Sequence, residues 1–151
     1  MRNRILFSIA AAVLSAPVLA QAGDPLLGQS ASGRWTYRQV AGGTEAAFAD
    51  ATGAPQLAIR CTRATRRVSI IRPAMAPAPT LHLWTSNETR QLPAIYDPAA
   101  AQLRSEIGAF DRLLDALAFS RGRFAVAVAG AAPVVVPNWP EPTRAIEDCR
   151  N

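Results

Sequence analysis

Arginine side chains are the strongest candidates for chemistry in this chain. Five of them lie within 13 residues with no acid between them: Arg60, Arg63, Arg66, Arg67 and Arg72. A guanidinium group donates forked hydrogen bonds that match carboxylates and phosphates. We therefore predict a binding site at Arg63, Arg66 and Arg67, with Arg60 beside them. An acidic envelope protein or another anionic envelope component would be the partner.

Two other features of the sequence bear on binding. Trp139 lies between Pro137 and Pro140 and is a second candidate binding residue, although the same side chain could pack in the core. The arginine run has an alternative interpretation as a solvated turn. Every cation in the chain is arginine, and GC-rich codons alone raise the arginine count.

The arginines are positioned by a predicted hairpin. Its strands are 56–61 and 67–72, and residues 62–66 form the turn. In the first strand Leu57, Ile59 and Cys61 fall on one face, which is the period of two that a half-buried strand needs. We expect the remaining strands to pack around this hairpin.

In total, the sequence predicts about seven or eight short strands and two short helices. The clearest helix covers 111–120, where Asp111 is the expected N-cap and Asp115 is expected to pair in solvent with Arg112 or Arg121. A terminal helix covers 143–150, with Glu147 and Arg150 expected to lie in solvent. The fold class is α+β, with a mainly antiparallel sheet or a small sandwich. Besides the hairpin, the candidate strand segments are residues 34–38, 44–50, 80–86, 89–96, 102–107, 123–128 and 133–136.

The N-terminus reads as an export signal. Arg2 and Arg4 precede the apolar run 5–14, and cleavage is predicted near Ala20 or Ala22. This leaves a flexible leader over 23–33 and a single globular domain over 34–151. We predict no stable membrane span in the mature chain, and a periplasmic or secreted location.

The two cysteines predict a disulfide between Cys61 and Cys149. They lie 88 positions apart, and closing such a loop stabilises a fold by about 4.6 kcal/mol in the chain-entropy model. Two free buried thiols or an intermolecular bond are the alternatives.

The net charge bears on the class of partner. Without Arg2 and Arg4, the chain has 14 arginines and 11 carboxylates, a net charge of about +3. This mild excess argues against a nucleic-acid-binding protein.

Catalytic groups are sparse. His82 is the only histidine, no serine lies in Gly-x-Ser-x-Gly, and Asp111 and Asp115 share one helix face rather than opposing sides of a cleft. The sequence has no phosphate-binding or dinucleotide-binding glycine motif, and it lacks zinc ligands once the cysteines pair. We predict a non-enzymatic protein without a cofactor. The alternatives are a hydrolase that uses these carboxylates or His82, and a purely structural envelope protein.

The order of features resembles a family of small exported proteins associated with type VI secretion, the TagO-like group. The positions that carry the resemblance are Trp35, the strand 57–61 that ends in Cys61, the leucine-rich helix 113–117, and the segment 146–149 that ends in Cys149. The family closes with Cys-Trp, whereas this chain ends Cys149-Arg-Asn151. The resemblance implies an exported accessory protein and transfers no active-site residue.

Overall fold

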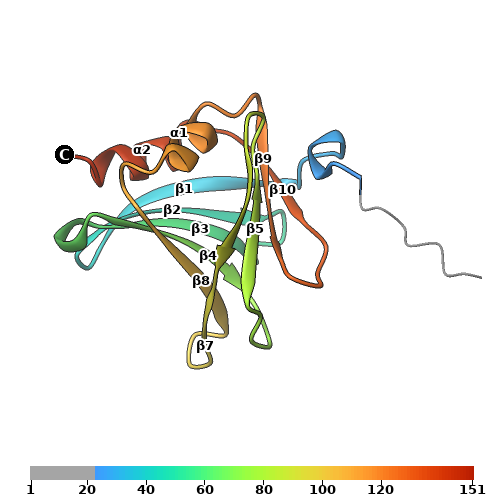
Figure 1. The fold of residues 1–151 in the computed structure, drawn as a ribbon, viewed down its shortest axis with the longest axis horizontal. Helices are drawn as coiled ribbons and strands as arrows, with labels where there is room; N and C mark the ends of the chain where they lie inside the picture. Colours follow the sequence, from blue (N-terminus) through green and yellow to red (C-terminus); the bar gives the residue numbers. More distant parts are fainter. Residues whose placement is uncertain (1–22) are drawn as a thin grey trace, which may run out of the picture.

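The computed structural model describes residues 23–151 and shows two antiparallel sheets with two short α-helices (Figure 1). Ten strands occur in this part of the chain, and the predicted α+β class is confirmed. The predicted export signal lies outside the described residues. No helix within 23–151 has the length and apolar character needed to cross a membrane.

The larger sheet has six strands and is called the large sheet below. Every neighbouring pair in it is antiparallel. In spatial order its strands are β1 (Gly33–Val40), β2 (Gly43–Asp50), β3 (Pro55–Thr62), β4 (Arg67–Pro73), β8 (Gln102–Gly108) and β7 (Ile95–Asp97).

The second sheet has four strands and is called the small sheet. It is also antiparallel, and the predicted strand segments 123–128 and 133–136 pair with each other in it. In spatial order its strands are β10 (Val134–Pro137), β9 (Arg123–Val128), β5 (Thr80–Trp84) and β6 (Thr89–Pro93).

The predicted central hairpin is confirmed as β3 and β4. Leu57, Ile59 and Cys61 are at most 2% exposed, as the alternating pattern requires. The turn contains a short 3-10 helix, η2 (Arg63–Thr65), and Arg66 closes it with a positive φ of 48°.

The single strand predicted over 89–96 is wrong. The chain forms β6 in the small sheet, leaves it after Pro93, and enters the large sheet as β7. Proline has no N–H group to donate to a neighbouring strand. The following residue, Ala94, donates its N–H to the carbonyl of Pro79 instead. This segment therefore connects the two sheets.

Helix α1 (Arg112–Ala118) begins where the sequence predicts. The Asp111 carboxylate accepts the N–H of Leu113 at 2.8 Å, which confirms its N-cap role. Helix α2 (Pro140–Asp148) begins three residues before its predicted start. Its early prolines fit this position because the N–H groups of the first helical turn have no partner within the helix.

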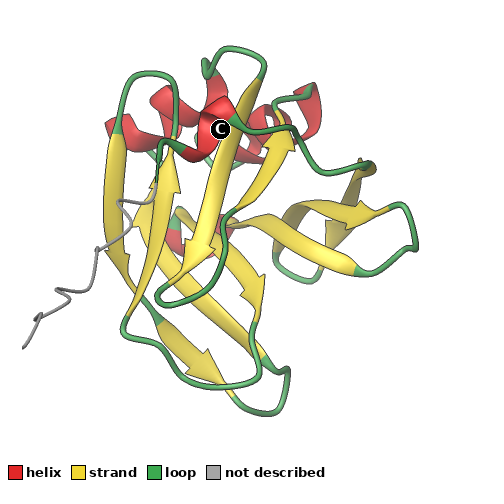
Figure 2. Ribbon diagram, turned by 90° about the vertical axis from the view of Figure 1, so that its right-hand side faces the viewer, coloured by secondary structure: helices red, strands yellow, loops and turns green. Residues whose placement is uncertain are grey.

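The core fills the space between the two sheets and beneath the helices. Trp35 of β1 packs against Phe48 and Phe124, which join the large sheet to the small one. Helix α2 contacts β1, β2 and β3 through Ala145 and Ile146. Figure 2 shows the α-helices together at one end of the strands.

The predicted disulfide is confirmed. Cys61 at the end of β3 is bonded to Cys149 directly after α2, and both residues are 1% exposed. The bond anchors the last helix to the inner face of the large sheet.

Two predictions about charged side chains near α2 are wrong. Arg150 was expected to lie in solvent, but its Nε donates to the carbonyl of Ala109 at 2.8 Å. Asp115 was expected to pair with Arg112 or Arg121, but it pairs with Arg150 at 2.7 Å. Arg150 therefore ties the end of α2 to α1.

Candidate binding surface

The outer face of the large sheet brings together three charged side chains from three strands. The alternation of strand residues turns Arg38, Glu45 and Arg60 away from the core. The strand register places Glu45 between the two arginines. Helix α2 and the small sheet pack on the opposite face, so these side chains face outward.

These three residues form what we call the Arg–Glu–Arg cluster. Arg38 donates to Glu45 Oε1 from Nε at 3.0 Å and from Nη2 at 2.5 Å. Arg60 donates to Oε2 from Nε at 2.7 Å and also from Nη2. Glu45 is only 2% exposed, while the side chains of Arg38 and Arg60 are 64% and 40% exposed. One buried carboxylate thus holds two accessible guanidinium groups.

The carboxyl group of Glu45 is ionised within this cluster. Burial acts to raise the pKa of Glu45, but hydrogen bonds from Arg38 and Arg60 and their positive charges outweigh burial. The pKa is therefore lower than the ordinary glutamate value. An ionised Glu45 keeps both guanidinium planes in place at neutral pH.

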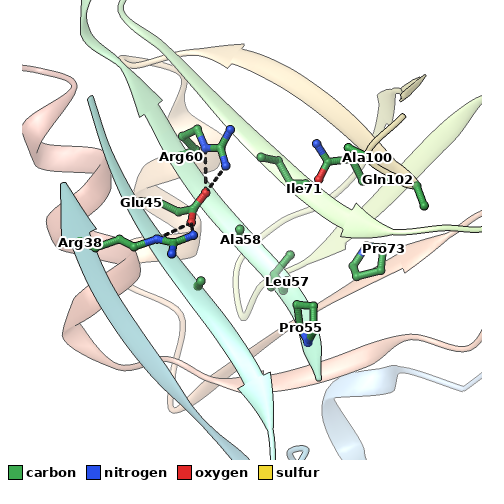
Figure 3. Close-up of a pocket in the computed structure, with 12 residues that line it drawn as sticks. Arg38, Glu45, Pro55, Leu57, Ala58, Arg60, Ile71, Pro73, Ala100 and Gln102 are labelled. Carbon is green, nitrogen blue, oxygen red and sulfur yellow. Dashed lines mark hydrogen bonds and ion pairs between the residues drawn. The ribbon is translucent and has the colours of Figure 1, made fainter. Parts of the chain in front are cut away.

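A groove of about 240 Å³ lies beside the cluster on the same face. Figure 3 shows Glu45 between the two guanidinium groups at one end, with Pro55 and Pro73 at the other. Ala47 and Ala58 contribute small side chains to the lining, and Ile71 is 5% exposed. The groove therefore combines a cationic end with an apolar remainder.

The predicted arginine tip adjoins this face. Arg63, Arg66 and Arg67 are all exposed at the β3–β4 turn. Arg67 pairs with Thr62, which lies two positions after Arg60 in β3. Residues two positions apart share a face, so Arg67 and Arg60 lie on the same face of the large sheet. Within the described residues none of the three tip arginines forms a salt bridge. The structure thus brings the four predicted arginines to one end of the large sheet.

Over the rest of the outer face, arginines and acids are equal in number, so the excess of arginine comes from the cluster and the tip. Outward positions hold two further exposed arginines, Arg34 and Arg104, and two further acids, Glu106 and Asp97. Arg104 pairs with Glu106 at 3.3 Å. We call the outer face and the tip together the basic surface, defined by Arg34, Arg38, Arg60, Arg63, Arg66, Arg67 and Arg104.

Trp139 lies away from the basic surface. It is the N-cap of α2 and is 43% exposed, whereas the opposite end of α2 carries the disulfide to Cys61. A nine-residue helix rises about 14 Å. Trp139 is therefore a partly exposed aromatic at the far end of α2, and the structure does not place it with the arginines.

The candidate catalytic residues are not assembled into one site. His82 stacks on Trp84 on the outer face of the small sheet, with their ring centroids 5.6 Å apart. A hollow of about 500 Å³ lies beside them. Asp111 accepts from Arg90 Nη1 at 2.8 and 2.9 Å. Arg90 and His82 occupy opposite faces of the small sheet, because Arg90 is paired with Leu83, the inward-facing neighbour of His82.

Comparison with protein-family models, curated proteins and solved structures finds no match to this chain. The surface is therefore interpreted from its own geometry. Within residues 23–151, no group of three or more His, Cys, Asp and Glu side chains could hold a metal ion.

Arg38 and Glu45 were not predicted as site residues. Their strands were predicted, but they lie 22 and 15 positions from Arg60 in the sequence. Only the pairing register places them together. The one available signal was Glu45, a charged residue that directly precedes the apolar run 46–49. The two neighbouring strands could then have been aligned so that Arg38 and Arg60 each lie opposite Glu45.

Proposed function

We propose that this protein is an exported, non-enzymatic accessory protein that docks to an acidic protein of the bacterial envelope. The observation that carries the proposal is the basic surface, where exposed arginines gather on one sheet face and its adjoining turn. Charge complementarity of this kind steers association and selects partners.

The composition of the surface favours a protein over a polyanion. The mature chain has a net charge of only about +3, and Glu45, Glu106 and Asp97 interrupt the arginines. Mixed charges with small apolar side chains suit a partner that itself presents both acidic and apolar groups. A uniformly charged polymer would gain little from the apolar groove.

The disulfide supports the exported location within this proposal. Cys61 and Cys149 form a buried bond, and such bonds persist in oxidising compartments such as the periplasm. The layout shared with TagO-like proteins makes a type VI secretion component the first class of partner to test.

Crosslinking and capture from periplasm would test the proposal. The bait is the exported mature protein, compared with a variant that carries Arg63→Glu and Arg67→Glu. Both arginines are exposed, so the variant should fold normally. Arg66 is kept because its positive φ makes its backbone sensitive to substitution. We expect the wild type to capture one acidic protein, and the variant to capture at least tenfold less of it.

The matched control reverses two exposed arginines elsewhere, Arg112 and Arg121, so that the net charge changes equally. This control should retain the partner. Equal loss in both variants would show a nonspecific charge effect and contradict a defined docking surface. Binding of anionic lipid vesicles in place of a protein would overturn the choice of partner class.

A further inference from the structure

We infer that the groove beside the Arg–Glu–Arg cluster receives a monocarboxylate that carries a short apolar group. The inference rests on the docking role proposed above and names the chemical group that the partner would insert. The carboxylate belongs to the docked protein, either at its chain terminus or on an acidic side chain with an apolar neighbour.

The cluster has donors available for this ligand. The contacts to Glu45 use only Nε and Nη2 of Arg38 and Arg60. One nitrogen of each guanidinium group therefore makes no contact to Glu45, as Figure 3 shows. Each guanidinium carries five N–H donors in a fixed plane. Because Glu45 already fixes both planes, a ligand would meet donors that need little further ordering.

The net charge of the cluster favours a ligand that carries a single negative charge. Two guanidinium groups and one ionised carboxylate leave one net positive charge, which one carboxylate neutralises. A phosphate group carries about −1.5 to −2 charges at neutral pH and would bring its excess charge close to Glu45. Glu45 thus acts as a positioning residue and also disfavours dianions.

The remainder of the groove suits an apolar group of limited size. Ala47, Ala58, Ile71, Pro55 and Pro73 provide carbon surface next to the cluster. Its volume of about 240 Å³ corresponds to roughly eight water molecules, at about 30 Å³ each. A carboxylate with three to five carbon atoms is therefore small enough to lie in the groove.

The inference is tested by NMR titration of the folded mature protein, with the arginine Nε–Hε signals of Arg38 and Arg60 as the readout. The ligands are isovalerate, its neutral analogue isovaleramide, and inorganic phosphate at equal ionic strength. We expect isovalerate to shift both signals in a saturable manner. Isovaleramide and phosphate should bind with at least tenfold lower affinity. Equal affinity for phosphate, or shifts spread over all exposed arginines, would overturn the inference.

Three variants make the test specific. Arg38→Gln and Arg60→Gln should each weaken isovalerate binding at least tenfold, whereas Arg121→Gln, an exposed arginine away from the groove, should change it less than twofold. Glu45→Gln should raise phosphate affinity relative to isovalerate by at least fivefold, because it removes the charge that opposes a dianion. Unchanged selectivity in a folded Glu45→Gln protein would contradict the role assigned to Glu45.

Short peptides then distinguish the sources of the carboxylate. One ends in Ala-Val with a free terminus, one is its amide, and one is an acetylated Asp-Val amide. Binding of the first alone identifies a chain terminus, and binding of the third alone identifies an acidic side chain. If isovalerate binds and neither acidic peptide does, the groove takes a free acid and not a group of the docked protein, which would overturn the choice of occupant. No carboxylate binding, with partner capture still dependent on Arg63 and Arg67, would overturn this inference and leave the docking proposal standing.

Discussion

Cys61 and Cys149 join the central hairpin to the last helix, with their Cα atoms 5.3 Å apart. The bond closes a loop across 88 positions and holds α2 against the inner face of the large sheet. The same hairpin displays the arginine tip on its other side. The disulfide and α2 therefore support the basic surface from the opposite face of the large sheet.

Reduction of this disulfide should destabilise the protein strongly. The chain-entropy model gives a loss of up to about 4.6 kcal/mol in the free energy of unfolding, so the melting temperature should fall by several degrees or more. Calorimetry with and without reductant measures the effect, and a thiol assay before treatment should find no free thiol. An unchanged melting curve in reductant, with two thiols reactive beforehand, would contradict the stabilising role of the bond.

The stability contributed by Glu45 should depend on pH. Its pKa in the folded protein lies below the ordinary value of 4.5, so the unfolded chain binds more protons in the acidic range. The contribution is therefore complete above about pH 5 and is lost as the pH falls through the lowered pKa. Urea unfolding of wild type and Glu45→Gln from pH 3 to pH 7 should show a difference that shrinks with acid. A difference that is constant over this range would contradict the ionised cluster.

Replacement of Asp111 should separate its two roles. Asp111→Ala removes the N-cap of α1 and the ion pair with Arg90, and should cost about 1–2 kcal/mol. Asp111→Asn keeps an oxygen that accepts the Leu113 N–H and loses only the charge, so its loss should be less than half as large. Equal losses in the two variants, measured by urea unfolding, would show that the ion pair and not the cap is the stabilising contact.

Gly43 is required by the close approach of β2 to β3. A Cβ atom there would lie 1.9 Å from the carbonyl oxygen of Cys61, and a backbone atom cannot move aside easily. Gly43→Ala should cost at least about 2 kcal/mol and weaken the β2–β3 pairing. Gly108→Ala is the matched control, because its Cβ would meet nothing within 4 Å. Similar stability of both variants in urea unfolding would contradict this packing.

Local patterns in the sequence were enough to predict the hairpin and the helix cap. Leu57, Ile59 and Cys61 recur at every second position, and Asp111 directly precedes a leucine-rich helix. Both signals depend on residues that are adjacent in the chain. The division of 89–96 between two sheets was not predictable in this way, because either sheet satisfies the same alternation of side chains.

The arrangement of the basic surface was predicted only in part for the same reason. The arginine tip lies within one turn and was visible in the sequence. The cluster formed by Arg38, Glu45 and Arg60 depends on the register of three strands, which the sequence alone did not fix. Arg150 was assigned to solvent because its partners Ala109 and Asp115 lie on another segment.

Site-specific photocrosslinking tests the central claim most directly. A photoreactive amino acid is placed at Thr36, exposed on the outer face of the large sheet, or at Gln91, exposed on the outer face of the small sheet. If a partner docks on the basic surface, irradiation in the periplasm should yield an acidic protein adduct from position 36 and none from position 91. An adduct from position 91 alone would contradict the account and assign docking to the small sheet.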